Sequence, residues 1–296
     1  MNQRIGVLAG ILVVQLLLVL AFKFSGSSSA DAEQAWLEFD IGSVDQFVIS
    51  DSAQSVTLSK HDEGWMIEDL PADLSKVEGI LGKMAALDAP WPVATSSESA
   101  ARFEVQENNF QRRVRLLAGT TTVADMLLGT SPGYQRVHAR QTDGSEIYSV
   151  ALSNYELPTT LDGWLDKALL AASTAPSRIE VANVETGQID ILEETAEGWL
   201  LNGKAADQDA AATYANRFQS LRVMNLLLDE TDYRTVASLR YMVGDEQREL
   251  SLRQKGSGDE TDYAISTPGG ERFVLATYIA EQLLSLDVAQ PDLTQP

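Results

Sequence analysis

An internal repeat at an offset of 134 residues constrains the fold of this chain more than any other feature. Aligning the sequence with itself at that offset needs no gap over about 45 positions, which is typical of two copies of one supersecondary unit. The identities are sparse, so the order of strand, turn and helix patterns carries the match. The matched residues are Ser43 with Ser177, Glu63-Gly64-Trp65 with Glu197-Gly198-Trp199, Ala72-Asp73 with Ala206-Asp207, and Leu87 with Leu221.

Each copy begins with a pattern of three short strands followed by a helix. Asp73 and Asp207 are suitable helix N-caps, because a carboxylate can accept a hydrogen bond from the free N–H groups of the first turn. Apolar residues then recur at helical spacing in both copies. The predicted strands are Gln46 to Ser50, Val56 to Lys60 and Trp65 to Glu68 in the first copy, and Arg178 to Val184, Ile189 to Glu193 and Trp199 to Leu201 in the second.

The later part of each copy matches less regularly. Gln111 to Leu117 resembles Gln247 to Leu252, and Glu146 to Val150 resembles Glu271 to Leu275. Three strand-like segments of the first copy face only two in the second, so the second copy is predicted to be a trimmed version. Each copy is expected to close on a helix, over Ser153 to Leu170 and Thr277 to Leu286.

The N-terminal run Ile5 to Phe22 has eighteen residues without a charge, close to the roughly 20 that span a bilayer. Arg4 precedes it, which favours a cytoplasmic N-terminus with the bulk of the chain outside. We therefore expect a single-pass inner-membrane protein whose mass is periplasmic. A cleaved signal peptide is the alternative, because Ser28 and Ala30 suit cleavage after Ala30, although the apolar run is longer than such signals usually are.

These patterns predict an α+β fold, in which an N-terminal transmembrane helix is followed by two tandem, related units of antiparallel sheet plus helices. The predicted parts are the anchor (1–24), a tether (25–39), the first repeat (40–170), a linker (171–176), the second, trimmed repeat (177–289) and a tail (290–296).

Charge and cysteine content exclude several functions. The 296 residues contain 22 basic and 43 acidic side chains, a net charge of −21, which would repel nucleic acid. The chain has no cysteine, so disulfides, thiolate metal sites and a thiol nucleophile are excluded.

No catalytic or metal-binding constellation is evident. His61 and His138 are the only histidines, and neither stands at a metal-ligand spacing. The pentapeptide Asp-Glu-Thr-Asp-Tyr occurs at 229–233 and 259–263, but it lacks the ligand order of a calcium loop, so acidic turns are the favoured interpretation over cation binding. We expect no enzyme activity, no cofactor and no metal.

Two pairs of residues have both a structural and a functional interpretation. Trp65 and Trp199 are expected to be core anchors of their hairpins rather than ligand platforms. Arg113 and Arg115 share one face of a predicted strand, which is typical of a half-exposed strand. They are nevertheless the best candidates for partner docking, because they belong to the only basic cluster outside the anchor.

A series of weak motifs follows the order of the predicted elements. The motifs are Glu63-Gly64-Trp65, Leu127-Leu128-Gly129, Tyr134, Arg136-Val137, Ile147-Tyr148, Val150 and Trp164-Leu165-Asp166-Lys167. Their order, over roughly residues 40 to 290, resembles the family of domain of unknown function 4340. The resemblance implies a membrane-anchored extracytoplasmic protein associated with ABC-type transporter subunits of the gliding-motility type, and it offers no catalytic residues.

Two functions are compatible with these observations. The first is a non-enzymatic accessory protein, held in the membrane by Ile5 to Phe22, that binds transporter subunits with extracytoplasmic domains. The second is a periplasmic binding module for a polymer or small ligand in a groove between the repeats.

Overall fold

The computed structural model describes Gln15, residues 36–89 and residues 91–288. The predicted anchor, the first part of the tether and the tail lie outside these described residues, Gln15 apart. No helix within the described residues reaches the length and apolarity that a bilayer crossing requires.

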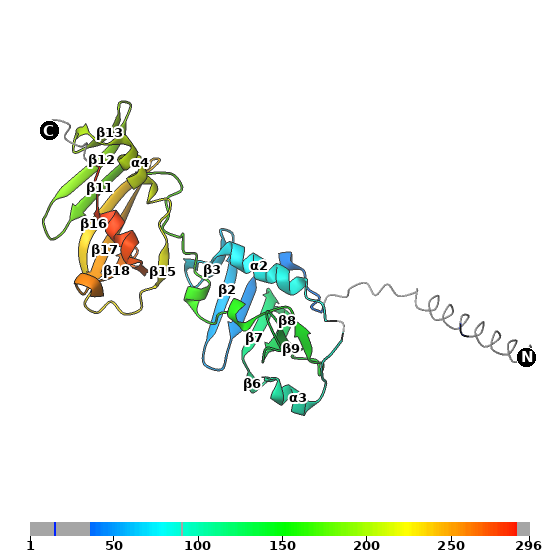
Figure 1. The fold of residues 1–296 in the computed structure, drawn as a ribbon. Helices are drawn as coiled ribbons and strands as arrows, with labels where there is room; N and C mark the ends of the chain where they lie inside the picture. The colour runs from blue at the N-terminus through cyan, green and yellow to red at the C-terminus, as the bar shows by residue number, and fades with distance from the viewer. Residues whose placement is uncertain (1–14, 16–35, 90, 289–296) are drawn as a thin grey trace, which may run out of the picture. The chain divides into compact units, whose positions relative to one another are not determined.

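The described part is mainly β, with α2 to α5 as its α-helices (Figure 1). The predicted α+β class therefore contained too much helix, whereas the predicted antiparallel pairing of the strands is confirmed. The elements of the first copy are η1 (Ile41–Ser43), β1 (Gln46–Ser50), β2 (Ser55–His61), β3 (Gly64–Ile67), β4 (Leu70–Pro71), α2 (Leu74–Ala85), α3 (Ser97–Arg102), β5 (Val105–Gln106), β6 (Asn109–Phe110), β7 (Arg112–Ala118), β8 (Thr121–Leu128), β9 (Val137–Gln141), β10 (Tyr148–Val150), η2 (Asn154–Glu156) and η3 (Leu161–Gly163). Those of the second copy are β11 (Arg178–Asn183), β12 (Ile189–Thr195), β13 (Gly198–Leu201), β14 (Lys204–Ala205), α4 (Gln208–Asn216), β15 (Val223–Leu226), β16 (Arg234–Val243), β17 (Glu246–Lys255), η4 (Gly258–Glu260), β18 (Asp262–Ser266), β19 (Arg272–Leu275) and α5 (Thr277–Leu284).

The internal repeat is confirmed by the element boundaries. β12, β13 and β14 begin and end 134 residues after β2, β3 and β4, and α4 begins 134 residues after α2. The same hydrogen bonds recur: the amide of Ala72 donates to the Trp65 carbonyl at 2.9 Å, and the amide of Ala206 donates to the Trp199 carbonyl at 3.0 Å. Both predicted caps form, since Asp73 and Asp207 accept from the third residue beyond them.

The first strand departs from the offset of 134. Phe47 pairs with Leu58 on β2, and Ile179 pairs with Leu192 on β12, so β1 and β11 correspond at an offset of 132. Two extra residues in the β11–β12 turn account for the difference. The ungapped match from Ser43 is therefore wrong over β1 and right from β2 onward.

The predicted loss of one sheet strand from the second copy is wrong. The two larger sheets have the orders β10-β9-β8-β7-β1-β2-β3-β4 and β14-β13-β12-β11-β16-β17-β18-β19-β15. β7 therefore corresponds to β16, and every strand of the first sheet has a counterpart in the second. The sequence match had paired β7 with β17, one strand too late, because β16 was not predicted.

One of the two predicted closing helices is present. α5 forms over Thr277–Leu284, whereas residues 153–170 form only the short 3₁₀ turns η2 and η3. Pro158 interrupts that segment, because it cannot donate a helical hydrogen bond, and the indole N–H of Trp164 donates to its carbonyl at 2.7 Å instead.

The described residues divide into two compact units. One contains residues 36–44 and 80–156, and the other contains residues 45–79 and 157–288. We call them the neutral unit and the acidic unit, since the first carries 7 basic against 10 acidic residues and the second 13 against 30. The repeat boundaries expected from the sequence, 40–170 and 177–289, stay a prediction.

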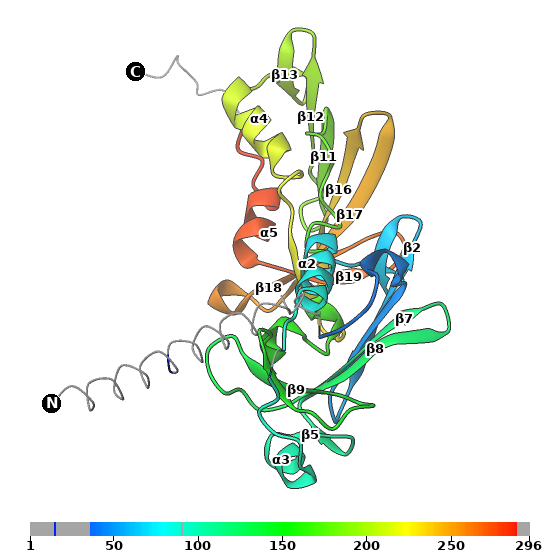
Figure 2. The same cartoon turned by 90° about the vertical axis from the view of Figure 1, so that its right-hand side faces the viewer.

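The nine-stranded sheet of the acidic unit has one buried face and one charged face. Helices α4 and α5 lie against one face, where Tyr214, Phe218 and Leu283 are part of a large apolar core (Figure 2). On the opposite face Glu180, Arg240 and Glu249 are directly opposite one another on β11, β16 and β17, with ion-pair distances of 3.2 and 3.3 Å. That face is a solvated ladder.

Candidate interaction surface

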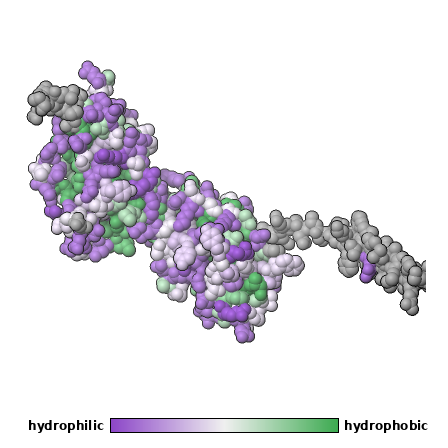
Figure 3. Space-filling view, viewed as in Figure 1, coloured by the Kyte–Doolittle hydropathy of each residue, from purple (hydrophilic) through white to green (hydrophobic). Residues whose placement is uncertain are grey.

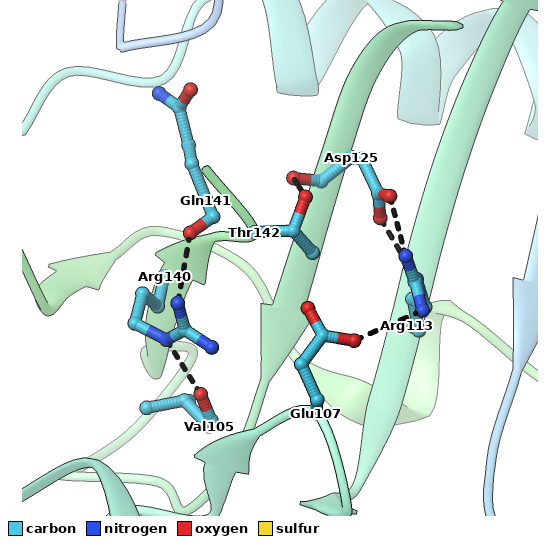
Figure 4. Close-up of polar contacts among 7 residues, drawn as sticks. All are labelled: Val105, Glu107, Arg113, Asp125, Arg140, Gln141 and Thr142. Carbon is cyan, nitrogen blue, oxygen red and sulfur yellow. Dashed lines mark hydrogen bonds and ion pairs between the residues drawn. The ribbon is translucent and has the colours of Figure 1, made fainter. Parts of the chain in front are cut away.

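The two predicted docking residues, Arg113 and Arg115, both lie on β7 but differ in their contacts. Arg113 makes a bidentate contact with Asp125 on β8, at 2.9 and 2.6 Å, and a further ion pair with Glu107 at 3.2 Å (Figure 4). The hydrogen bonds to Asp125 are the main reason why the pKa of the Arg113 guanidinium is raised. Its charge is therefore already neutralised by neighbours.

Arg115 is not paired with any charge of the described residues. It lies opposite Asp125 in the β7–β8 register, yet that carboxylate is directed to Arg113. The Arg115 side chain is exposed, and no hydrogen bond or ion pair joins it to the described residues. Of the two predicted residues, Arg115 is the one that has a charge available to a partner.

An insertion after α2 covers another part of this sheet face. Residues 97–110 form α3, β5 and β6, and Ala100 and Val105 pack with Leu127 and Ile147 into a small apolar cluster. Arg140 on β9 fastens the insertion, because its guanidinium donates to the Val105 carbonyl at 2.7 Å (Figure 4). The same guanidinium donates to the Gly144 carbonyl at 2.8 Å, which holds the Arg140 side chain in place. Sequence reasoning missed this insertion.

His138 packs beside the same insertion. Its ring stacks on Phe103 with centroids 4.0 Å apart, and its Nδ1 lies 2.9 Å from both the hydroxyl and the carbonyl oxygen of Thr130. Burial lowers the pKa of His138 below its ordinary value, the hydrogen bond to Thr130 opposes this, and the charge of Arg102 adds to it. His61 is exposed at the end of β2.

Tyr134 is displayed on a rigid turn of the neutral unit. Its side chain is 88% exposed, and the next residue, Gln135, has a positive φ of 50°. The turn is held by Ser131 Oγ, which lies 2.7 and 2.8 Å from the carbonyl oxygens of Gly133 and Arg136. Arg136 in turn donates to the hydroxyl of Ser149 at 2.8 Å and to its carbonyl oxygen.

Tyr155 is displayed in the same way on η2. It is 96% exposed, while both of its neighbours are fixed. Asn154 donates to the Gly129 carbonyl at 2.9 Å, and Glu156 accepts from the Ser153 amide at 2.9 Å and pairs with Lys83 at 2.6 Å. Asn154 thus ties η2 to Gly129, which directly precedes the segment 130–136 that contains Tyr134. We call Tyr134, Tyr155 and their turns the tyrosine corner.

Comparison with known families settles the relationship. A family model, described as domain of unknown function (DUF4340), matches residues 65–238, which is more than half of the chain. The chain belongs to this family. No curated protein and no solved structure gives a significant match. The matched range begins in β3 of the first copy and ends in β16 of the second, so the family model takes in parts of both copies.

Two motifs that carried the resemblance to DUF4340 have structural roles. Gly129 follows β8, and a Cβ atom there would lie 1.9 Å from the Phe103 carbonyl oxygen. Only glycine lets the insertion pass this close. Arg136 satisfies the carbonyl of Ser149 on β10, the last strand in the order of its sheet. Such a contact blocks an unpaired strand edge from pairing with another chain.

The Trp-Leu-Asp-Lys motif of DUF4340 lies in a segment that joins two parts of the acidic unit, and we call residues 161–167 the strap. On one side, Ala72 pairs with Leu165, and the amide of Asp73 donates to the Trp164 carbonyl at 2.7 Å. On the other side, the strap follows β15. The amide of Val223 donates to the Lys167 carbonyl at 2.9 Å, and the amide of Leu226 donates to Asp162 Oδ1 at 2.7 Å.

The remaining sequence candidates are structural. Trp65 and Trp199 are buried, which confirms the core interpretation. In the first acidic pentapeptide, Glu230 pairs with Arg253 and Arg272 at 3.0 Å each, and Asp229 accepts from the Thr231 amide. Among the described residues, no group of three or more histidine or carboxylate side chains is placed to hold a metal ion.

Proposed function

We propose that this chain is a membrane-anchored, extracytoplasmic accessory protein of an ABC-type transporter, and that the neutral unit binds a transporter subunit. Membership of DUF4340 supports the class of protein, because the family resemblance implied this setting. The proposal needs no catalysis: its chemistry is protein recognition beside a membrane, where anchoring confines both partners to one surface and raises their effective concentration.

The tyrosine corner is the observation that carries the proposal. Interface hot spots are enriched in tyrosine, tryptophan and arginine, and a turn whose backbone is already held in place loses less entropy on binding. Tyr134 and Tyr155 are almost fully exposed, yet the backbone of both turns is fixed by hydrogen bonds. The small net charge of the neutral unit also avoids the repulsion that the acidic unit would exert on an acidic partner.

Photo-crosslinking tests the proposal directly. A photoreactive phenylalanine analogue at Tyr134 or Tyr155 of the full chain should crosslink to a permease or ATPase subunit in native membranes. The matched control is the same analogue at Tyr278 on α5, which is 64% exposed and lies in the acidic unit. Crosslinks to a transporter subunit from Tyr278 alone, or from none of the three positions, would contradict the proposal.

The expected orientation has its own test. Because the natural chain has no cysteine, a single cysteine introduced by Glu63→Cys, at an exposed turn, reports sidedness without background. We expect a maleimide that cannot cross membranes to label it in cells whose outer membrane has been permeabilised. Labelling only after disruption of the inner membrane would place the acidic unit, which contains Glu63, in the cytoplasm and refute the proposal.

A further inference from the structure

Trp91 is the one exposed tryptophan of this chain. All five tryptophans lie in the described residues, and the other four are at most 9% exposed, whereas Trp91 is 82% exposed. A large indole ring left in water buries no apolar surface, so its retention there contributes nothing to the stability of the fold. Its position requires another explanation.

The sequence neighbours of Trp91 are apolar or uncharged. Pro92 and Val93 beside it are also exposed, and no charged residue occurs between Asp88 and Glu98. The backbone of this loop is fixed at its end, because the amide of Val93 donates to the Ile147 carbonyl at 2.7 Å and the amide of Ile147 donates to the Ala94 carbonyl at 2.8 Å. The fold thus presents a small apolar tip whose C-terminal end is fixed by hydrogen bonds.

The described fold begins beside this tip. The amide of Trp36 donates to the Leu87 carbonyl at 2.9 Å, four residues before Trp91. The ring of Trp36 also contacts that of Tyr148 at 5.7 Å between centroids, next to the Ile147 that holds Val93. The start of the fold and the two ends of the Trp91 loop therefore meet at the beginning of β10.

The chain before Trp36 limits how far this tip can be from the proposed membrane anchor. Twelve residues separate Phe22 from Ala35 by sequence, and a fully extended chain of that length spans at most about 40 Å. An indole ring with an apolar body and an N–H donor is the side chain that concentrates at membrane interfaces.

We infer that Trp91, with Pro92 and Val93, inserts into the lipid interface next to the anchor and so fixes the neutral unit against the membrane surface. The inference rests on the anchor of the proposed function. The absence of charge from 89 to 97 suits a zwitterionic headgroup region, since neither headgroup charge is repelled. The anchor and the tip would then be two membrane contacts of one unit.

Fluorescence of the full chain in phosphatidylcholine nanodiscs tests the inference, with acyl chains that are either plain or brominated near the headgroups. Subtracting the spectrum of Trp91→Phe isolates the emission of Trp91, because the other tryptophans are buried. We expect brominated lipid to reduce that component about twofold or more. The control moves the exposed tryptophan to the acidic unit by combining Trp91→Phe with Tyr278→Trp, and its new emission should be quenched much less.

The possible failures are distinguishable. A chain that stays in the discs at alkaline pH while its Trp91 emission is equal in plain and brominated lipid would overturn the inference and leave the anchor intact. A chain that leaves the discs under the same wash would overturn the anchor and the inference together. Shielding of Trp91 only after a transporter subunit is added to the discs would assign the tip to a protein partner and also overturn the inference.

Discussion

At the scale of single residues, the neutral unit depends on close contacts that only particular side chains permit. Gly129 has no room for a side chain, because the carbonyl oxygens of Phe103 and Glu104 occupy the space where a Cβ atom would lie. The ring of His138 stacks on Phe103 in the adjacent space, and burial there lowers its pKa. Both residues hold the insertion on the sheet.

Gly129→Ala should destabilise the neutral unit by about 3 kcal/mol or more, because the added methyl group can be accommodated only by moving backbone. Gly133→Ala is the matched control: a Cβ there meets nothing within 4 Å, so its effect should stay within about 0.5 kcal/mol. Urea unfolding of both variants measures the difference. Equal midpoints for the two would show that the insertion does not lie as close to β8 as described.

The lowered pKa of His138 predicts a pH dependence with a definite sign. Between the unfolded value of about 6.5 and the lower folded value, the unfolded chain binds more protons, so stability falls as the pH falls through this window. The slope is at most about 1.4 kcal/mol per pH unit. His138→Gln should remove this part of the dependence, whereas His61→Gln, at the exposed histidine, should keep it. Unfolding free energies of the wild type and of both variants, measured from pH 7.5 to pH 5, test this prediction. An unchanged pH dependence in His138→Gln would contradict it.

At the scale of elements, the strap closes a sheet edge with side chains as well as backbone. The ammonium of Lys167 donates to the carbonyls of Asp162, at 2.8 Å, and Met224, while Asp162 accepts from the amide of Leu226. Partial burial lowers the pKa of Lys167, and the nearby Asp162 opposes that effect. β15 is therefore held between β19 and the strap.

Asp162→Ala should leave the Leu226 amide without its acceptor, at a cost of about 1–3 kcal/mol. Hydrogen exchange at the amides of β15 should become faster in the same variant. Lys167→Met tests the other contact against Lys204→Met, which changes an exposed lysine on β14 and should be neutral. If β15 exchanged at the wild-type rate in Asp162→Ala, the strap would not be what protects this edge.

The elements also show which parts of the fold the sequence could predict. The meanders, both helix caps and the buried tryptophans could be predicted from local sequence patterns. Each of these patterns occurs in both copies of the repeat, which strengthens the prediction. The insertion was missed because α3 buries only Ala100, so no apolar stripe marks it. The strap was mistaken for a helix because its partners, Ala72 and Val223, lie far away in sequence. The tyrosine corner was missed because exposure cannot be read from a sequence.

At the scale of the whole molecule, the compact units do not coincide with the two predicted repeats. Residues 45–79, from the first repeat, belong to the same unit as the second repeat, together with the strap. Charge is divided in the same way, with most of the net negative charge in that unit. Figure 3 shows hydrophilic residues over much of the visible surface, with smaller apolar areas between them.

This division predicts how fragments of the chain behave. A fragment of residues 177–288, the second repeat as predicted from the sequence, lacks Leu165 and Ala172 of the core and leaves β15 without the strap. A fragment of residues 157–288 keeps both. Each large apolar side chain that is buried contributes about 1.5–3 kcal/mol to stability. The free energy of unfolding of the longer fragment should therefore be higher by several kcal/mol, and its urea midpoint should be higher too. The comparison is controlled internally by Asp162→Ala in the longer fragment, which should remove only the β15 part of the gain. Equal stability of the two fragments would mean that the second repeat folds independently of the strap. The folding unit would then begin at residue 177, as predicted from the sequence, and not at residue 157.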